Sequence, residues 1–328
     1  MNPQHIACLG GGHGLYQTLL AARELGAETI SAIVTVADDG GSSGRLRREL
    51  GVIPPGDLRM ALAALANGDD DGGLWARTLQ HRFRGNGALA GHAVGNLLIA
   101  GLVEVMGDMQ AALDRVCELT QSHGRVFPVV NLPLDIEAEV AGLDDDPMVM
   151  RPVRGQVAVA TTPGAVHRVR ILPAAPAANP EALAALSRAD MITLGPGSWF
   201  TSVIPHVLVP DIVDAINASD ALRVLVLNLS AEPGETQGFS AERHIHVLAQ
   251  HAPGLKVDRV LVDTNSQLTD SEKIHLRRAA SALGAHVEFC DVCIVREDGQ
   301  LTSKHDPVKL AAAFRGLFAE GRKPQPLD

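Results

Sequence analysis

The sequence has few aromatic residues: phenylalanine, tryptophan and tyrosine make up 3% of 328 residues, and Tyr16 is the only tyrosine. Proteins that bind single-stranded nucleic acid stack its bases on aromatic side chains, so this scarcity argues against such a platform. Basic residues are also in the minority, because 28 lysines and arginines face 38 aspartates and glutamates, for a formal net charge of −10. This excess of negative charge argues against nucleic acid or an anionic membrane as the main partner.

Long apolar runs are absent as well. The longest, at residues 97–106, contains Glu104 and is too short to cross a bilayer. Nothing near the N-terminus resembles a secretory signal, because the apolar run at residues 6–9 is short and no basic segment precedes it. We therefore expect a cytoplasmic protein with no membrane span.

Cysteine is scarce too, with four residues at positions 8, 117, 290 and 293. Cys290 and Cys293 form a single Cys-x-x-Cys within a segment that reads as a strand. A zinc site needs a second pair or histidines at ligand spacing, and we find neither. We therefore expect packed thiols in a reducing compartment.

The residues that are present predict a large core, since 46% are hydrophobic and only 20% are charged. Short apolar runs alternate with helical segments along most of the chain. This rhythm predicts an α/β fold, with a Rossmann-like, mostly parallel sheet flanked by helices in a single nucleotide-binding domain over residues 1–328. Residues 125–172 differ, because their short β-rich runs are separated by glycine, proline or aspartate clusters, and they predict an antiparallel β insertion.

The most informative stretch is the first fifty residues, which read as a strand, a glycine turn, a helix, a second strand and an acidic loop rich in glycine and serine. Glycines let backbone N–H groups approach an anion, and the dipole of the following helix attracts the same charge. A carboxylate after the second strand is placed to accept hydrogen bonds from ribose or base, and Arg45 adds a cation. We predict a site for a phosphorylated nucleotide here. Its candidate residues are Gly11, Gly12, His13, Gly14, Asp38, Asp39, Ser42, Ser43 and Arg45.

A second glycine-rich turn follows the predicted strand at residues 189–194. It offers backbone N–H groups and the hydroxyls of Ser198 and Thr201 as further anion donors. Asn228 ends the next predicted strand, and ligands of parallel α/β sheets gather at such ends. The candidate residues from these two loops are Gly195, Pro196, Gly197, Ser198, Thr201 and Asn228.

Three polar residues elsewhere allow two interpretations each. His92 and Asn96 lie four residues apart on a helix predicted over residues 89–106, where an internal hydrogen-bond network or a ligand or metal would explain them, and we favour the second. Asp57 stands where it would cap a helix predicted over residues 58–66. It is equally suited to hold a cation or a phosphate-bound water.

These motifs together resemble one known family. The most specific block is Asp38-Asp39-Gly40-Gly41-Ser42-Ser43-Gly44, and the others lie at residues 10–15, 54–57, 91–97, 194–198 and 232–236. With them the sequence is similar, nearly end to end, to the gluconeogenesis factor family, also called the YvcK-like family. His13 departs from the pattern, because the family usually has threonine there.

The resemblance implies a Rossmann-like fold shared with the 2-phospho-L-lactate transferases, or CofD-like proteins, which make the precursor of the deazaflavin cofactor F420. It implies a cytoplasmic protein that binds UDP-sugars such as UDP-N-acetylglucosamine and supports cell shape and cell-wall synthesis during growth on gluconeogenic carbon. It does not by itself imply catalysis, and it requires no cofactor. Mg²⁺, a homodimer and cell-wall-synthesis partner proteins are left open.

Two enzymatic alternatives remain. A transferase could move a phospholactyl group to a deazaflavin alcohol, with Mg²⁺ offsetting the phosphate charge. The transferase branch looks to have Pro-Asp-Leu-Asp-Thr at the position of residues 56–60. This chain keeps the first acid as Asp57 but has Arg59 in place of the second. A nicotinamide-dependent oxidoreductase is compatible with the glycine turn, but no acid or base for hydride transfer is evident near the other loops.

Overall fold

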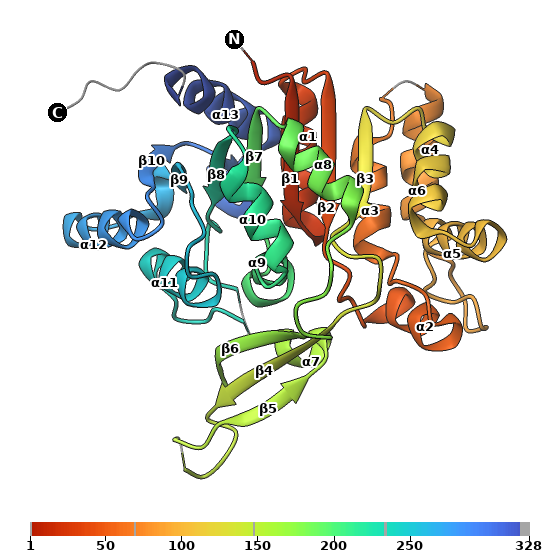
Figure 1. Ribbon diagram of the computed structural model, residues 1–328, viewed down its shortest axis with the longest axis horizontal. Helices are drawn as coiled ribbons and strands as arrows, with labels where there is room; N and C mark the ends of the chain where they lie inside the picture. The colour runs from red at the N-terminus through yellow and green to blue at the C-terminus, as the bar shows by residue number, and fades with distance from the viewer. Residues whose placement is uncertain (1, 69, 147, 233–234, 322–328) are drawn as a thin grey trace.

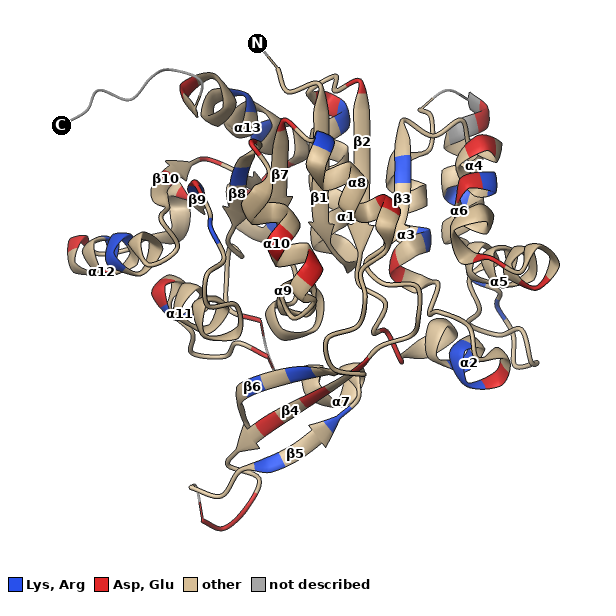
Figure 2. Ribbon diagram, in the orientation of Figure 1, with Lys and Arg blue, Asp and Glu red and all other residues tan. Residues whose placement is uncertain are grey.

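The fold is built on a seven-stranded sheet in which every neighbouring pair of strands is parallel (Figure 1). The computed structural model describes residues 2–68, 70–146, 148–232 and 235–321. The strands are β1 (His5–Gly10), β2 (Thr29–Val34), β3 (Gly124–Pro128), β7 (Met191–Leu194), β8 (Leu222–Val226), β9 (Arg259–Asp263) and β10 (His286–Cys290). The central strands β1, β2 and β7 carry no charged residue, because both of their faces are covered (Figure 2).

The strand order is β10-β9-β8-β7-β1-β2-β3, so the chain leaves β1 toward β2 and later returns to β1's other side as β7. Leu9 of β1 lies opposite Ile33 of β2 on one side and Leu194 of β7 on the other. The order of strands therefore reverses at β1. In open parallel sheets such a switch point leaves a crevice at the carboxyl ends of the strands, where ligands bind.

Helices cover both faces of the sheet (Figure 1). The helices α1 (Gly12–Glu24), α3 (Gly56–Leu65) and α13 (Pro307–Gly321) pack on one face, and α8 (Pro180–Arg188), α9 (Ile204–Val207) and α10 (Pro210–Ala218) pack on the other. The remaining helices are α2 (Gly41–Leu50), α4 (Asp70–Gln80), α5 (Val94–Met106), α6 (Met109–Leu119), α11 (Ala241–His251) and α12 (Asp270–Ser281). A π-helical turn, η1 (Trp199–Val203), precedes α9, and a 3-10 turn, η2 (Thr264–Ser266), follows β9.

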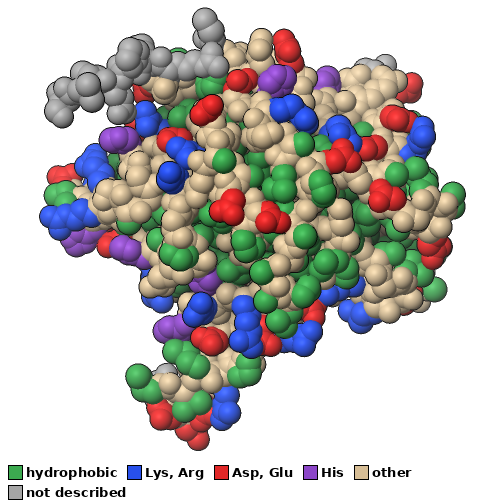
Figure 3. All heavy atoms as spheres, viewed as in Figure 1, with side chains coloured by type: hydrophobic (Ala, Val, Ile, Leu, Met, Phe, Trp, Pro, Cys, Tyr) green, Lys and Arg blue, Asp and Glu red, His purple; other side chains and the backbone are tan. Residues whose placement is uncertain are grey.

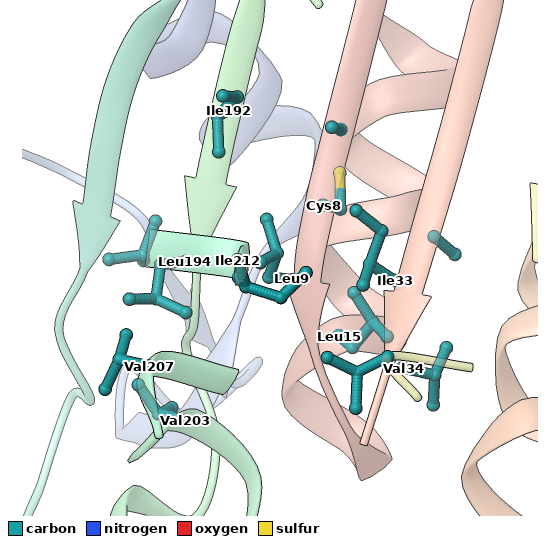
Figure 4. Packing of buried hydrophobic residues seen from close by; sticks show 14 of the residues in the cluster. Cys8, Leu9, Leu15, Ile33, Val34, Ile192, Leu194, Val203, Val207 and Ile212 are labelled. Atoms are coloured by element: carbon teal, nitrogen blue, oxygen red, sulfur yellow. The ribbon is translucent and has the colours of Figure 1, made fainter. Parts of the chain in front are cut away.

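The core lies between these layers. Figure 4 shows buried side chains of β1, β2 and β7 packed together with Val203 of η1 and Val207 of α9. These side chains are at most 5% exposed. Burying each of them contributes about 1.5–3 kcal/mol, and this packing holds the strand ends that carry the loops described below.

The insertion is a separate three-stranded antiparallel sheet of order β5-β4-β6 that projects from the main body (Figure 3). It consists of β4 (Asp135–Ala141), β5 (Arg151–Arg154), α7 (Gln156–Ala160) and β6 (Ala165–Leu172). The predicted insertion began at residue 125, which is wrong, because β3 pairs in parallel with β2 in the main sheet. A short apolar run does not reveal which sheet it will join.

Three predicted elements differ in their bounds. The predicted last strand is two strands, β10 and β11 (Cys293–Val295), because the chain turns between them and β11 pairs antiparallel with β12 (Leu301–His305). The helix predicted from residue 89 begins at Val94. The glycine-serine loop after Asp39 is the first turn of α2, which begins at Gly41.

The four cysteines are free thiols, and Cys8, Cys117 and Cys293 are buried, as expected. No single helix in the described residues has both the length and the apolar composition needed to cross a membrane. The bent pair Trp199–Val207 and Pro210–Ala218 meets these criteria only when its two halves are counted together.

Candidate functional site

A cavity of about 260 Å³ opens at the carboxyl ends of β1, β2 and β7, where the strand order reverses. We call it the switch-point cavity. Its lining residues are Gly11, Gly12, His13, Gly14, Thr35, Asp38, Asp57, Gln156, Gly197, Ser198, Thr201, Ser202 and Glu232. The first glycine turn, the acidic loop, Asp57 and the second glycine turn, predicted separately from the sequence, therefore line one cavity.

Two glycines allow these loops to meet. A Cβ on Gly14 would lie 2.1 Å from the carbonyl oxygen of Pro196, so the first turn of α1 packs directly on the loop after β7. A Cβ on Gly11 would lie 2.6 Å from Asp57 Oδ2 and 3.1 Å from Ser202 Oγ. Any larger residue at either position would push the walls of the cavity apart. The positive φ of Gly12, 55°, further shapes the turn and favours glycine.

Asp38 and Asp57 form an acid pair on one wall. Burial, followed by the charge of Asp38, raises the pKa of Asp57 to about 7, and burial also raises the pKa of Asp38. A Cβ on Gly56 would lie 2.5 Å from Asp38 Oδ2, so this glycine leaves room for the carboxylate. Asp57 lies inside the first turn of α3, whose cap position is Pro55, so the predicted helix cap is wrong.

The acid pair has the chemistry of a Mg²⁺ site completed by a ligand. Among the described residues, no three His, Cys, Asp or Glu side chains are arranged to hold a metal ion. Mg²⁺ commonly takes one or two carboxylates and completes its shell with phosphate oxygens and water. Thr35 Oγ1, which lines the same cavity and is buried without a hydrogen-bond partner among the described residues, offers a further oxygen. The residues therefore fit Mg²⁺ bound together with a phosphorylated ligand.

Arg59 lies behind the acid pair and is 3% exposed. Its Nε donates to Asn96 Oδ1 at 2.9 Å, while its Nη1 has no partner among the described residues. Burial, followed by the charge of Arg82, lowers the pKa of Arg59 to about 10, so the guanidinium stays charged at neutral pH. It partly offsets the negative charge of Asp38 and Asp57.

His92 and Asn96 belong to an internal network, the interpretation that we favoured less. Asn96 Nδ2 donates to Ser42 Oγ at 3.0 Å, and His92 Nδ1 lies 2.9 Å from the same hydroxyl. His92 precedes α5, so the predicted shared helical face is wrong; Ser42 of α2 brings the two residues together. None of the three lines the switch-point cavity.

Three other predicted site residues position loops. Asp39 accepts hydrogen bonds from the backbone N–H groups of Gln156 and Val157, at 3.0 and 2.9 Å. Ser43 Oγ accepts one from Gly56 N–H at 2.6 Å. Arg45 donates to the carbonyls of residues 88 and 90 and does not line the cavity. The prediction that its guanidinium is a cation of the site is therefore wrong.

Replacing Arg45 by alanine should therefore affect stability more than ligand binding. We expect Arg45→Ala to lower the free energy of unfolding by about 1–2 kcal/mol, because two carbonyls lose a charged donor. Nucleotide affinity should change by less than about threefold, because the hydrogen bonds that are lost hold the loop at residues 88–90 and do not contact the ligand. Urea unfolding and calorimetric titration measure the two effects. A tenfold loss of affinity at unchanged stability would instead place Arg45 on the ligand.

The second glycine loop is held in place by side-chain hydrogen bonds to neighbouring segments. Asn228 Oδ1 accepts from Gly197 N–H, and Asn228 Nδ2 donates to Gly197 O, both at 3.0 Å. Thr201 Oγ1 donates to Glu235 Oε1 at 2.6 Å, and burial raises the pKa of Glu235 to about 7. Gly195 has a φ of 74° that favours glycine at this turn. Asn228 and Gly195 thus shape the loop, while Gly197 and Ser198 face the cavity.

A neighbouring cavity of about 200 Å³ shares His13, Gly14, Gly197 and Glu232 with the switch-point cavity. It adds Lys304 and His305 from the end of β12, which the sequence did not assign to the site. Among the described residues that line the two cavities, Lys304 is the only lysine or arginine. His305 Nε2 is buried without a hydrogen-bond partner in the described part of the chain.

Sequence reasoning missed several lining residues for identifiable reasons. Thr35 lies inside the predicted second strand, and Ser202 directly follows Thr201 after the second glycine turn. Gln156 and Lys304 come from the insertion and from the hairpin β11–β12, far away in sequence. Glu232 belongs to a polar loop that was recognised but given no role; its neighbours Pro233 and Gly234 lie outside the described residues. Only a tertiary contact could reveal these positions.

Comparison with known proteins identifies the family. Residues 6–300 match the protein family described as 2-phospho-L-lactate transferase CofD. A gluconeogenesis factor of Bacillus subtilis is 37% identical over 325 residues, which cover 96% of this chain and 98% of that protein. The chain belongs to the gluconeogenesis factor family, within the CofD-like superfamily. The resemblance first seen in the glycine and aspartate motifs is thereby confirmed.

More similar family members occur in mycobacteria. A protein of Mycobacterium leprae, provisionally named a gluconeogenesis factor, is 58% identical over 316 residues, covering 96% of this chain and 86% of that protein. A crystal structure of a UPF0052-family protein from Bacillus halodurans superposes with a TM-score of 0.82 at 33% identity, covering 95% of this chain and 99% of that one. The α/β Rossmann-like fold is confirmed by this likeness and by the parallel sheet.

Proposed function

We propose that this member of the gluconeogenesis factor family is a cytoplasmic regulatory protein that binds a UDP-sugar in the switch-point cavity and so supports cell shape and cell-wall synthesis during gluconeogenic growth. The observation that carries the proposal is the convergence of residues 11–14, Asp38, Asp57 and residues 197–202 on one cavity. Glycine turns at the N-terminus of α1 and after β7 supply the backbone donors that diphosphates require.

The charges of the site support a requirement for Mg²⁺. Three carboxylates, Asp38, Asp57 and Glu232, line the switch-point cavity, while its described lining contains no lysine or arginine. A diphosphate placed there alone would be repelled. Mg²⁺ held by Asp38 and Asp57 would neutralise part of its charge, and Lys304 in the neighbouring cavity is placed to neutralise more.

The alternative is a transferase that passes a phospholactyl group to a deazaflavin acceptor, and the description of the matched family is consistent with it. Arg59 argues against this alternative, because a buried cation occupies the position where the transferase branch looks to have a second acidic residue. The lining of the switch-point cavity also contains no phenylalanine, tyrosine or tryptophan among the described residues, so none of these rings is there to stack on a flavin-like ring. We therefore favour binding without catalysis.

Calorimetric titration tests the proposal. Purified protein is titrated with UDP-N-acetylglucosamine, UDP-glucose, GDP and NAD, each with and without Mg²⁺. We expect the UDP-sugars to bind with Mg²⁺ and to bind at least tenfold more weakly without it, because the acid pair then repels the diphosphate. Lys304→Ala should weaken binding about tenfold, whereas Lys256→Ala, a change of an exposed lysine, should leave it unchanged.

Two results would overturn the proposal. Tight binding of GDP together with a deazaflavin, and none of UDP-sugars, would favour the transferase. Binding of NAD alone would favour an oxidoreductase. Equal affinities of wild-type protein and Lys304→Ala for the UDP-sugars would show that Lys304 and the neighbouring cavity do not bind the phosphates.

A further inference from the structure

The insertion contributes one residue to the switch-point cavity, and that residue is not explained by the fold. Gln156, the first residue of α7, is half-buried and lines the cavity together with residues of both glycine turns. None of the hydrogen bonds among the described residues involves its side-chain carboxamide, whereas its backbone N–H donates to Asp39. A carboxamide that both donates and accepts therefore faces the site without a protein partner.

The backbone of α7 is fixed at this position by Asp39. The two carboxylate oxygens of Asp39 accept from the N–H groups of Gln156 and Val157. Gly155 makes this approach possible, because a Cβ there would lie 2.5 Å from Asp39 Oδ2, and its φ of 105° favours glycine. A Cβ on Gly40 would likewise lie 2.8 Å from a methyl group of Val157. These contacts of Asp39 thus join the insertion to the acidic loop, next to Asp38.

The other side of α7 packs against η1, which carries Thr201 and Ser202 of the opposite wall. The helix therefore reaches from the acidic loop on one side of the cavity to the second glycine loop on the other. In Figure 1, α7 lies at the junction between the insertion and the main body. A ligand seated on the glycine turns would extend beneath this helix.

We infer that α7 covers the sugar of the bound nucleotide sugar and that Gln156 reads it, with Asp39 as the residue that positions α7. This inference rests on the proposed function and extends it to the specificity of the same site. The lining of the cavity consists of glycines and polar side chains, with no phenylalanine, tyrosine, tryptophan or large aliphatic residue among those described. Such a lining suits a hydroxyl-rich pyranose, whose hydroxyl and amide groups pair with a carboxamide, rather than a flat base.

The apolar part of the nucleotide has a different place in this arrangement. The neighbouring cavity is lined in part by Pro196, Leu229 and Ala231, which offer the apolar surface that a base requires. The diphosphate then lies at the residues that both cavities share, His13, Gly14, Gly197 and Glu232. The sugar then lies on the side of Gln156.

The decisive measurement is the ratio of the affinities for UDP-N-acetylglucosamine and UDP, both with Mg²⁺. We expect Gln156→Ala to lower this ratio about three- to tenfold and to leave the affinity for UDP unchanged, because one hydrogen bond to the sugar is lost. Alanine is a good helix former, so the variant should fold. Gln250→Ala, which changes an exposed glutamine of α11, is the matched control and should preserve the ratio.

Asp39→Asn gives an independent measurement. Asparagine keeps one acceptor oxygen, so α7 should loosen without unfolding the domain. We expect a lower affinity ratio. The Gln156 and Val157 amides should also exchange hydrogen faster than in the wild type. Binding of UDP-N-acetylglucosamine should slow this exchange in the wild type but not in the variant.

The outcomes separate this inference from the proposed function. Wild-type protein that binds neither UDP nor UDP-sugars would refute the proposed function and the inference with it. Wild-type protein that binds both ligands equally, or a Gln156→Ala variant that keeps the ratio or weakens both ligands alike, would overturn the inference and leave nucleotide binding intact.

Discussion

Asp57→Asn is expected to abolish Mg²⁺-dependent nucleotide binding and at the same time to stabilise the free protein at pH 8. The first effect follows because the acid pair loses one of its two anionic oxygen ligands, and neutral asparagine neither attracts Mg²⁺ strongly nor completes the pair with Asp38. We expect UDP-sugar affinity with Mg²⁺ to fall at least tenfold, to the level measured without the metal. Calorimetric titration checks this.

The gain in stability follows from the raised pKa of Asp57. Burial and the neighbouring charge raise that pKa from 3.8 to about 7, so the folded state favours the protonated carboxyl. The stabilisation from this proton is fully present below about pH 4 and is lost as the pH rises through 7. At pH 8 the ionised carboxylate therefore costs the folded state on the order of 2–4 kcal/mol, and asparagine removes this cost while keeping an acceptor for Gly12 N–H.

Urea unfolding of both proteins at pH 5 and pH 8 measures this effect. The difference in free energy of unfolding between wild type and Asp57→Asn should widen from pH 5 to pH 8, whereas Asp220→Asn, a change of an exposed aspartate, should show no such trend. A variant that is less stable at pH 8 than wild type would show that Asp57 is ionised favourably in the free protein. Retained Mg²⁺ dependence would show that the metal binds elsewhere.

Gly14→Ala is expected to have the second large effect. The added Cβ would lie 2.1 Å from the carbonyl oxygen and 2.5 Å from the carbonyl carbon of Pro196, and both are backbone atoms that no side-chain rotation can move. The loop after β7 must therefore shift away from α1. We expect a loss of about 2–4 kcal/mol in the free energy of unfolding and at least a tenfold loss of UDP-sugar affinity, since both phosphate loops are displaced.

The matched control is Gly101→Ala, because Gly101 is also a helical glycine but has no atom within 4 Å of an added Cβ. Alanine there should stabilise α5 by about 0.5–1 kcal/mol through its higher helix propensity and leave binding unchanged. The two substitutions should thus change stability in opposite directions in the same denaturation assay. Equal effects would mean that the contact between Gly14 and Pro196 does not constrain the loops.

The sequence by itself determined the parallel α/β core and most of the glycine-turn residues that line the switch-point cavity. Apolar runs such as β1 and β2 are followed by glycines and an aspartate, and this local order is enough to place Gly11, Gly12, Gly14 and Asp38 at strand ends. The carboxyl ends of parallel strands lie at one edge of a sheet, so local patterns also predict which loops come together. For the same reason the second glycine loop was placed correctly at that edge.

Only the tertiary structure decided what each polar side chain contacts. Arg45, Asp39 and His92 stand in the right motif, yet their partners are backbone carbonyls, backbone amides and the Ser42 hydroxyl, all in segments more than forty residues away. Conversely, Gln156 and Lys304 reach the cavities from the insertion and the hairpin β11–β12, which carry no local signal of binding. Hydrogen bonds depend on distances of about 3 Å between groups, and chain packing sets such distances, whereas residue spacing along the sequence does not.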